Sequence, residues 1–118
     1  VSAQTAKTVR EMLEVVVSED GTASSLQIPG YRVGGKTGTA NRYNEDTGGY
    51  SGYTSSFIGM APAENPALVM SVSIHNPKTS TYGSVVAGPV FKEVMTYALA
   101  HEKIPPSTTK PPKLPVKW

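Results

Sequence analysis

Seven consecutive residues, 34–40, read Gly-Gly-Lys-Thr-Gly-Thr-Ala and combine residue types that could bind a small anionic ligand. In an extended chain, successive side chains point to opposite faces, so Thr37 and Thr39 would share one face and Lys36 would point away from them. The glycines leave the backbone bare, which lets a ligand approach the main-chain N–H groups closely. Such a strand edge suits a ligand that carries a carboxylate and a carbonyl.

The same stretch also fits a nucleotide-binding pattern. Residues 30–37 match the P-loop consensus G-x-x-x-x-G-K-[ST] letter for letter. The consensus requires a buried strand before it and a helix that begins at its lysine. Residues 24–29 are too polar for a central parallel strand, and residues 37–49 show no apolar recurrence at helical spacing. The sequence therefore favours carboxylate binding, and a glycine-rich strand with a solvated lysine remains the alternative for the segment taken alone.

The composition indicates one modest globular domain. The chain has 118 residues, of which 38% are hydrophobic and 17% charged, with 11 glycines and 10 prolines. Its formal net charge is +2 without any run of like charge, which argues against a nucleic-acid partner. Cysteine is absent, and His75 has no second ligand at suitable spacing. We therefore expect neither a metal site nor a cofactor.

The chain shows no segment for membrane insertion or export. No stretch approaches the roughly 18 apolar residues of a membrane span, and no signal peptide is present. Because the first residue is Val1 rather than methionine, we expect the chain to be a piece of a longer polypeptide.

Two helices are expected, one on each side of the segment 34–40. Residues 1–18 place apolar side chains at helical spacing, with Ser2 as the capping residue and Gly21 in the left-handed conformation after the helix end. Residues 83–103 form the second helix, and Pro89 lies in or near its first turn, where a missing N–H costs little.

Three strands are expected between these helices. Residues 31–41 form the first strand, 53–61 the second and 67–75 the third. Residues 41–52 form a polar loop that is too long for a tight hairpin, and residues 62–66 form a turn. The sequence thus predicts an α+β fold in which a three-stranded antiparallel meander is flanked by N- and C-terminal helices.

The last residues differ in composition from the rest of the chain. Residues 104–118 hold five prolines among lysine, serine and threonine. We expect an extended, polyproline-like or disordered tail that follows a domain of residues 1–103. Docking of this tail onto the domain through Leu114 and Trp118 is the alternative.

Several of these features occur together in one known family. The segment 34–40 follows an amphipathic helix and Gly-Thr-Ala at 21–23. It precedes Ser-Ser-Phe-Ile-Gly-Met-Ala-Pro at 55–62, an apolar strand, and Gly-Ser-Val-Val-Ala-Gly-Pro-Val-Phe at 83–91. This order resembles the C-terminal part of the transpeptidase domain of class B penicillin-binding proteins, which share their fold with serine β-lactamases. The resemblance covers residues 1–103, and Lys-Thr-Gly is one signature motif of such serine acyl-transferases.

The resemblance implies a peptidoglycan D,D-transpeptidase that cross-links stem peptides by serine acyl transfer and is acylated by β-lactams. Lys36 would lend positive charge to substrate binding and to proton transfer. Thr37 and Thr39 would donate hydrogen bonds to the terminal carboxylate of a D-alanyl-D-alanine peptide, or of a β-lactam that mimics it. The N–H of Thr39 would form half of the oxyanion hole, and Gly38 would leave room for the acyl group.

The chain lacks two of the three motifs of this family. Its one Ser-x-x-Lys, at 107–110, lies in the proline-rich tail, and no Ser-x-Asn occurs. Since acyl transfer needs an activated nucleophile, we expect the serine in a missing N-terminal part of the same protein and expect the isolated chain to be inactive. The whole enzyme would be anchored in the cell membrane with its catalytic domain outside, among other cell-wall synthesis proteins.

Two other functions remain open at this stage. One is a serine β-lactamase or D,D-carboxypeptidase of the same fold, because the residues that govern deacylation would lie in the missing part. The other is a β-lactam-binding sensor domain without catalysis. All of these place Lys36 on an antiparallel strand, whereas a P-loop places it at the start of a helix.

Overall fold

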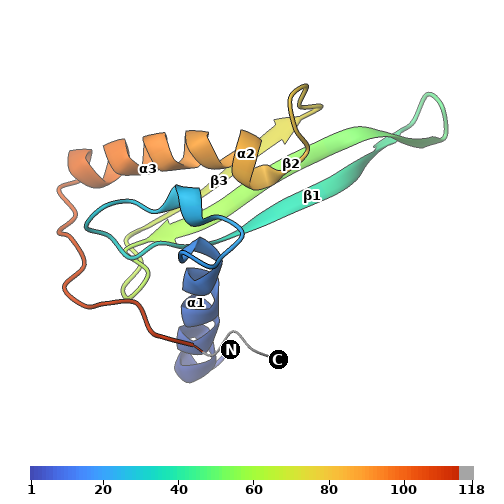
Figure 1. The fold of residues 1–118 in the computed structure, drawn as a ribbon. Helices are drawn as coiled ribbons and strands as arrows, with labels where there is room; N and C mark the ends of the chain where they lie inside the picture. Colours follow the sequence, from blue (N-terminus) through green and yellow to red (C-terminus); the bar gives the residue numbers. More distant parts are fainter. Residues whose placement is uncertain (115–118) are drawn as a thin grey trace.

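The computed structural model describes residues 1–114 as a sheet with helices packed against it (Figure 1). The helices are α1 (Ala3–Val17), the short α2 (Gly83–Val86) and α3 (Gly88–His101), and a single 3-10 turn covers Ser24–Leu26. The strands β1 (Gly34–Asn44), β2 (Gly49–Ala61) and β3 (Leu68–His75) are antiparallel and lie in the order β1-β2-β3. The predicted meander between N- and C-terminal helices is confirmed.

Helix α1 begins as predicted but ends differently. The hydroxyl of Ser2 accepts a hydrogen bond from the backbone N–H three residues on, at 3.1 Å. At the other end, Ser18 donates its hydroxyl hydrogen to the carbonyl oxygen of Val15, at 2.7 Å. The prediction of a left-handed Gly21 is wrong. Glycine is required there for space instead, because a Cβ would lie 2.2 Å from the carbonyl oxygen of Val16.

The predicted helix over residues 83–103 is divided into two. Helix α2 ends at Val86 and α3 begins at Gly88, so the chain turns at Ala87. Pro89 explains the break, because it has no N–H to donate to a carbonyl four residues earlier and therefore lies in the first turn of a new helix. Gly88 allows close packing at the break, since a Cβ there would lie 2.7 Å from the side chain of Leu26.

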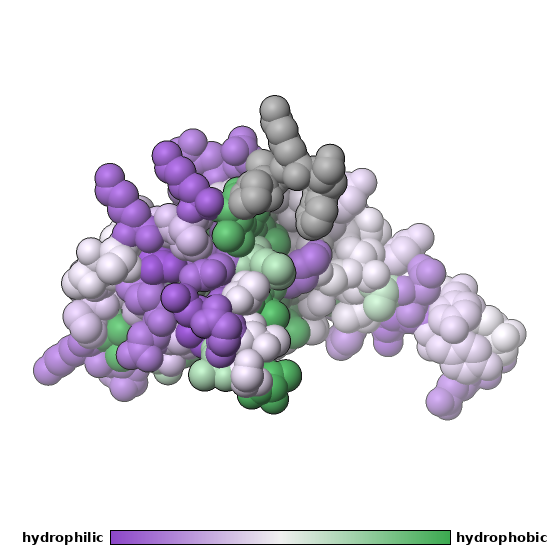
Figure 2. All heavy atoms as spheres, turned by 90° about the horizontal axis from the view of Figure 1, so that it is seen from below, coloured by the Kyte–Doolittle hydropathy of each residue, from purple (hydrophilic) through white to green (hydrophobic). Residues whose placement is uncertain are grey.

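Strands β1 and β2 form a hairpin that extends beyond β3 (Figure 1). Its loop covers only residues 45–48, so the long polar loop predicted over 41–52 is wrong. Tyr43 and Tyr50 pair across the strands, with ring centroids 5.7 Å apart in an edge-to-face arrangement. The space-filling view shows this hairpin as an arm projecting from the body, without a strongly hydrophobic patch (Figure 2). Because both faces of the hairpin contact solvent, its strands lack the alternation of apolar and polar residues from which strands are predicted.

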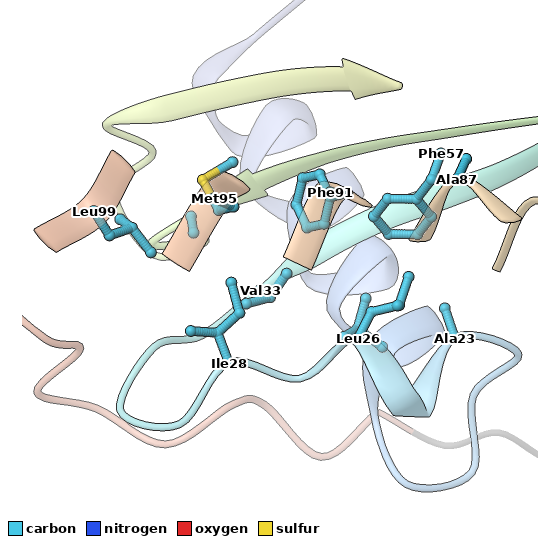
Figure 3. Close-up of a cluster of buried hydrophobic side chains, with 11 residues drawn as sticks. Ala23, Leu26, Ile28, Val33, Phe57, Ala87, Phe91, Met95 and Leu99 are labelled. Carbon is cyan, nitrogen blue, oxygen red and sulfur yellow. The ribbon is translucent and has the colours of Figure 1, made fainter. Parts of the chain in front are cut away.

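The core lies between α3 and the sheet, and two phenylalanines form its centre (Figure 3). Phe57 of β2 and Phe91 of α3 are fully buried, with ring centroids 4.7 Å apart. Glycines make room for both rings: a Cβ at Gly35 would lie 2.5 Å from the Phe57 ring, and one at Gly59 would lie 2.6 Å from the Phe91 ring. The other buried members of the core are Val17, Ala23, Leu26, Ile28, Val33, Ala61, Ala87, Met95 and Leu99. Within the segment 34–40, Gly35 is therefore needed for packing against the Phe57 ring.

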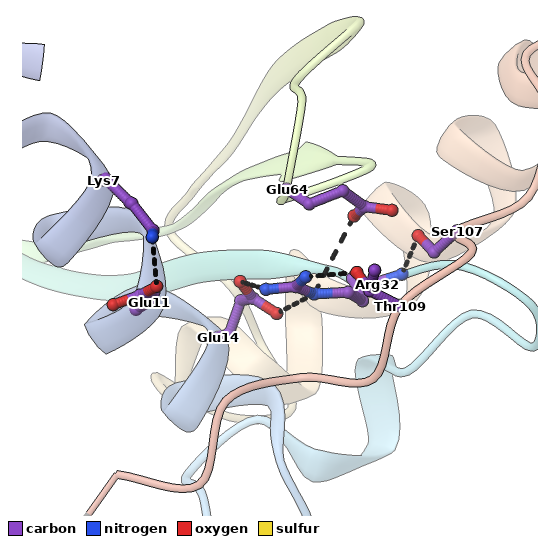
Figure 4. A network of polar contacts seen from close by, with 7 residues as sticks. All are labelled: Lys7, Glu11, Glu14, Arg32, Glu64, Ser107 and Thr109. Carbon is purple, nitrogen blue, oxygen red and sulfur yellow. Dashed lines mark hydrogen bonds and ion pairs between the residues drawn. The ribbon is translucent and has the colours of Figure 1, made fainter.

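A charged cluster joins α1 to the residues before β1 (Figure 4). The guanidinium of Arg32 donates to both carboxylate oxygens of Glu14, at 2.7 and 2.8 Å, and Glu14 is only 5% exposed. Glu64 approaches the same guanidinium at 3.8 Å. The hydrogen bonds that Arg32 donates to Glu14 raise the pKa of Arg32 above its ordinary value. This bidentate pair fixes where the chain enters β1.

The proline-rich tail runs back to the same cluster as irregular chain. The hydroxyl of Ser107 accepts a hydrogen bond from the N–H of Arg32 at 2.8 Å, and the N–H of Ser107 donates to the carbonyl oxygen of Gly30 at 2.9 Å. The hydroxyl of Thr109 accepts from the Arg32 guanidinium at 2.7 Å. Ser107 therefore belongs to a docking contact, and no helix holds Lys110 beside it.

The alternative prediction for the tail is docking onto the domain through Leu114 and Trp118. Leu114 lies beside α1, where it helps to line a hollow of about 570 Å³. Trp118 lies outside the described residues.

Candidate functional site

Residues 36–39 lie on β1, the edge strand of the sheet. Within the described part of the chain, β1 has a strand neighbour on one side only, so alternate N–H and C=O groups along it face an open edge. Thr37 lies opposite Phe57 in the register, and Thr39 lies opposite Ser55. Since Phe57 and Ser55 are both fully buried, the two threonines share the face of the sheet that the helices cover. This confirms that they share a face.

Lys36 lies opposite the exposed Ile58, on the other face of the sheet. Its side chain nevertheless bends back, and Nζ donates to the carbonyl oxygen of Thr37 at 3.1 Å and to the hydroxyl of Thr37 at 3.2 Å. The sequence predicts that Lys36 points away from the threonines. Its position in the strand does face the opposite side of the sheet, but its ammonium group bends back to Thr37. Because Lys36 lies on an antiparallel strand, the P-loop interpretation is excluded.

The two threonine hydroxyls differ in their hydrogen bonds. Thr37 accepts a hydrogen bond from Lys36, so its own hydrogen remains available for another acceptor. Thr39 is engaged with Thr81, because its Oγ1 donates to the carbonyl oxygen of Thr81 at 3.1 Å. A hydroxyl has one hydrogen, so Thr39 can donate to a ligand only after it releases Thr81.

The carbonyl oxygen of Thr81 has a second partner beneath it. The hydroxyl of Ser55 donates to this oxygen at 2.6 Å, from a side chain with no exposed surface. The residues that follow Thr81 are pressed onto the sheet: a Cβ at Gly83 would lie 2.1 Å from the carbonyl oxygen of Ser56 and 3.2 Å from that of Gly38. The position of the Thr81 carbonyl is therefore set by its close approach to β1 and β2.

Gly38 also has a structural partner on the sheet. A Cβ at Gly38 would lie 2.6 Å from the hydroxyl oxygen of Ser56, which stands opposite it in the register. Any larger residue at position 38 would have to displace this hydroxyl. This contact disfavours a side chain at position 38 even without a ligand, unless the Ser56 hydroxyl rotates away.

Sequence analysis missed Ser55 and Thr81. Ser55 is in phase with the buried Phe57 along β2, and a polar residue at a buried position is a detectable signal because it needs a hydrogen-bond partner. Thr81 acts through its backbone carbonyl, which every residue type possesses, so no residue pattern could have identified it.

Residues 1–114 show neither a cluster of metal-binding side chains nor a helix that could span a bilayer. No three His, Asp or Glu side chains of this range are grouped closely enough to hold a metal ion. None of its helices is both long and apolar enough to cross a bilayer.

A hollow of about 490 Å³ is lined by Glu14, Tyr31 and Pro111 among others, away from residues 36–39.

Comparison with known proteins gives a consistent result. Residues 1–96 match a family model described as the penicillin binding protein transpeptidase domain. A probable peptidoglycan D,D-transpeptidase, PenA of Neisseria flavescens, is 43% identical over 100 residues, which are 84% of this chain and 25% of the relative. Stage V sporulation protein D of Bacillus subtilis is 41% identical over 107 residues, 90% of this chain and 16% of the relative. The chain thus spans a quarter or less of the length of these relatives.

Solved structures show the same fold. The transpeptidase domain of penicillin-binding protein 3 from Burkholderia pseudomallei superposes with a TM-score of 0.78 and 44% identity, over 92% of this chain and 33% of that one. Penicillin-binding protein 3 of Mycobacterium tuberculosis, complexed with ampicillin, gives a TM-score of 0.80 and 38% identity, over 95% of this chain and 27% of that one.

Proposed function

Because this chain belongs to the penicillin-binding protein transpeptidase domain family, we propose that it is the C-terminal part of a peptidoglycan D,D-transpeptidase. The whole enzyme cross-links stem peptides by serine acyl transfer, and β-lactams acylate the same serine. The chain supplies one edge of the active site, and the nucleophile lies in the remainder of a longer polypeptide, which is anchored in the cell membrane with its catalytic domain outside.

One observation carries the proposal: the ammonium of Lys36 and the hydroxyls of Thr37 and Thr39 lie within four consecutive residues of the edge strand β1. Lys36 and Thr37 are already hydrogen-bonded to each other, and Thr39 lies on the same face as Thr37. A carboxylate accepts hydrogen bonds at two oxygens, and such charge-assisted bonds are about twice as strong as neutral ones. Thr37 donates the hydrogen that Lys36 leaves free, and the ammonium attracts the anion.

Thr39 has two tasks in this proposal. Its hydroxyl donates to the terminal carboxylate of a stem peptide ending in D-alanyl-D-alanine. Its backbone N–H provides half of the oxyanion hole, and losing one such donor typically costs about 3 kcal/mol of transition-state stabilisation. Gly38 keeps the approach to this N–H free of a side chain. The Mycobacterium tuberculosis protein has been solved in complex with ampicillin and with aztreonam, which supports β-lactams as ligands of this family.

The proposal is tested by acylation of the longer polypeptide with a fluorescent penicillin. Replacing Thr37 with valine exchanges the hydroxyl for a methyl group of similar size, and we expect the second-order acylation rate constant to fall about tenfold or more, as for a lost hydrogen bond to a charged group. Thr54→Val is the matched control, because Thr54 lies on the other face of the sheet and bonds to His75. Equal rates for the Thr37→Val variant and the unsubstituted protein would contradict the role of β1.

The location of the nucleophile is tested by denaturing mass spectrometry after incubation with penicillin. The 118-residue chain alone should carry no adduct, whereas the longer polypeptide should carry one outside this segment. A stable adduct on the chain itself would overturn the proposal and would make Ser107 the first serine to examine.

A further inference from the structure

We propose that Ser55 is a positioning residue for ligand binding, because its hydroxyl holds the Thr81 carbonyl when Thr39 turns to the ligand. This inference rests on the proposed function, in which Thr39 donates a hydrogen bond to the substrate carboxylate. Ser55 itself touches neither substrate nor nucleophile in this proposal. Ser55 instead determines how readily the Thr39 hydroxyl can change its acceptor.

The geometry gives the Thr81 carbonyl oxygen two donors in the free protein. Thr39 donates from the exposed edge at 3.1 Å, and Ser55 donates from beneath the surface at 2.6 Å. A carbonyl oxygen has two lone pairs and can accept both bonds at once. The shorter bond comes from Ser55, whose side chain has no exposed surface.

Ligand binding removes one of these two bonds. The single hydrogen of the Thr39 hydroxyl must leave Thr81 before it can reach a carboxylate. The exchange is favourable because a neutral bond is replaced by a charge-assisted one, and because Thr81 keeps its bond to Ser55. The carbonyl cannot move away to find another donor, since Gly83 is pressed against Ser56 just after it.

Removal of the Ser55 hydroxyl changes this exchange. Thr39 then becomes the only side-chain donor that the Thr81 carbonyl has in the described structure, so its release leaves this carbonyl without a donor from the protein. The Ser55→Ala variant should therefore bind a carboxylate ligand about fivefold more weakly, the equivalent of one ordinary hydrogen bond. The rate constant of acylation at saturating ligand should stay unchanged, because the backbone N–H groups and Lys36 are unaffected.

A double-mutant cycle in the longer polypeptide tests the inference with N-acetyl-D-alanyl-D-alanine for affinity and a penicillin for acylation. Thr39→Val should weaken binding of the dipeptide about tenfold or more. In that background Ser55→Ala should have no further effect on the dissociation constant, since the hydroxyl it acts through is gone. Thr54→Val, one residue before Ser55 and on the opposite face, should leave the affinity unchanged.

The outcomes separate the inference from the proposed function. If Thr39→Val leaves the affinity unchanged, the carboxylate role of Thr39 fails and the inference fails with it. If Thr39→Val weakens binding but Ser55→Ala does not, or if the two effects multiply, the proposed function stands and the role of Ser55 is refuted.

A measurement on the unsubstituted protein covers the case in which Ser55→Ala does not fold. The carbonyl carbon of Thr81 can be observed by NMR after selective labelling of threonine carbonyls and tyrosine amides, with Thr96 before Tyr97 in α3 as internal reference. Dipeptide binding should shift the Thr81 signal upfield as one hydrogen bond is lost, and should not shift it in Thr39→Val. An unmoved Thr81 signal at saturation would overturn the inference.

Discussion

Replacing Arg32 with alanine should lower the free energy of unfolding by about 3–5 kcal/mol, the usual cost of removing one partner of a buried ion pair. Glu14 is 5% exposed and receives both of its guanidinium hydrogen bonds from Arg32. Without Arg32 its carboxylate is left charged in a place where water can scarcely reach it. The bond from the guanidinium to Thr109 is lost as well.

The loss can be measured by urea denaturation followed by circular dichroism. The midpoint should fall while the slope with urea stays constant, because the fold and the area exposed on unfolding do not change. In a chain of this size each kcal/mol corresponds to about 4 °C of melting temperature, so the transition should also fall by about 12–20 °C.

Two control variants identify buried charge as the cause. Lys7→Ala breaks an ion pair with Glu11 in which Lys7 is 61% exposed, and it should change stability by less than about 0.5 kcal/mol. The double variant Glu14→Leu/Arg32→Met removes both charges and should recover most of the loss. A loss below about 1 kcal/mol for Arg32→Ala would refute the argument that Glu14 depends on this partner.

Three further substitutions test the packing and the tail by the same urea measurement. Gly35→Ala should destabilise the chain by about 1–3 kcal/mol, because the new Cβ would lie 2.5 Å from the Phe57 ring; unchanged stability would show that the ring can move aside. Phe91→Ala should cost about 3–5 kcal/mol, since it empties the centre of the core, and a cost near zero would contradict that placement. Ser107→Ala should cost about 1 kcal/mol through the lost bond from Arg32, whereas Ser80→Ala, with a 3.2 Å bond on the exposed surface, should cost less.

The amphipathic elements could be predicted because they bury one face. Leu68 begins a strand in which every second residue packs toward the core, and the period of two in the sequence follows directly from that burial. Helix α1 could be placed from its spacing and its Ser2 cap, but burial follows that spacing less closely, since Met12 is exposed and Glu14 is buried. Where one face is buried, the pattern of residue types records the structure.

The hairpin and the helix break could not be predicted in the same way. Residues 41–44 pair with residues 49–53 beyond the end of β3, so no face is buried and the polar sequence resembles a loop. At Ala87 the apolar spacing continues across the break, so periodicity alone does not reveal that Pro89 starts a new helix. Both errors arise where backbone geometry, rather than burial, decides the structure.

The candidate site was only partly predictable for a related reason. Lys36, Thr37 and Thr39 were identified because their residue types carry the chemistry. Their present hydrogen bonds depend on a lysine that bends back and on a carbonyl supplied by residue 81, some 42 positions later in the chain. Contacts of that kind depend on tertiary packing, which residue types alone do not specify.

The cluster around Arg32 has a consequence for the order in which the chain folds. Its bonds to Glu14 close a loop with a sequence separation of 18, whereas those to Ser107 and Thr109 span separations of 75 and 77. From an unfolded chain the longer closure costs about 1.3 kcal/mol more in conformational entropy. We therefore expect docking of the tail to follow formation of the sheet, which brings the two ends of that loop together beforehand. During unfolding, we expect the tail to be the first segment to detach.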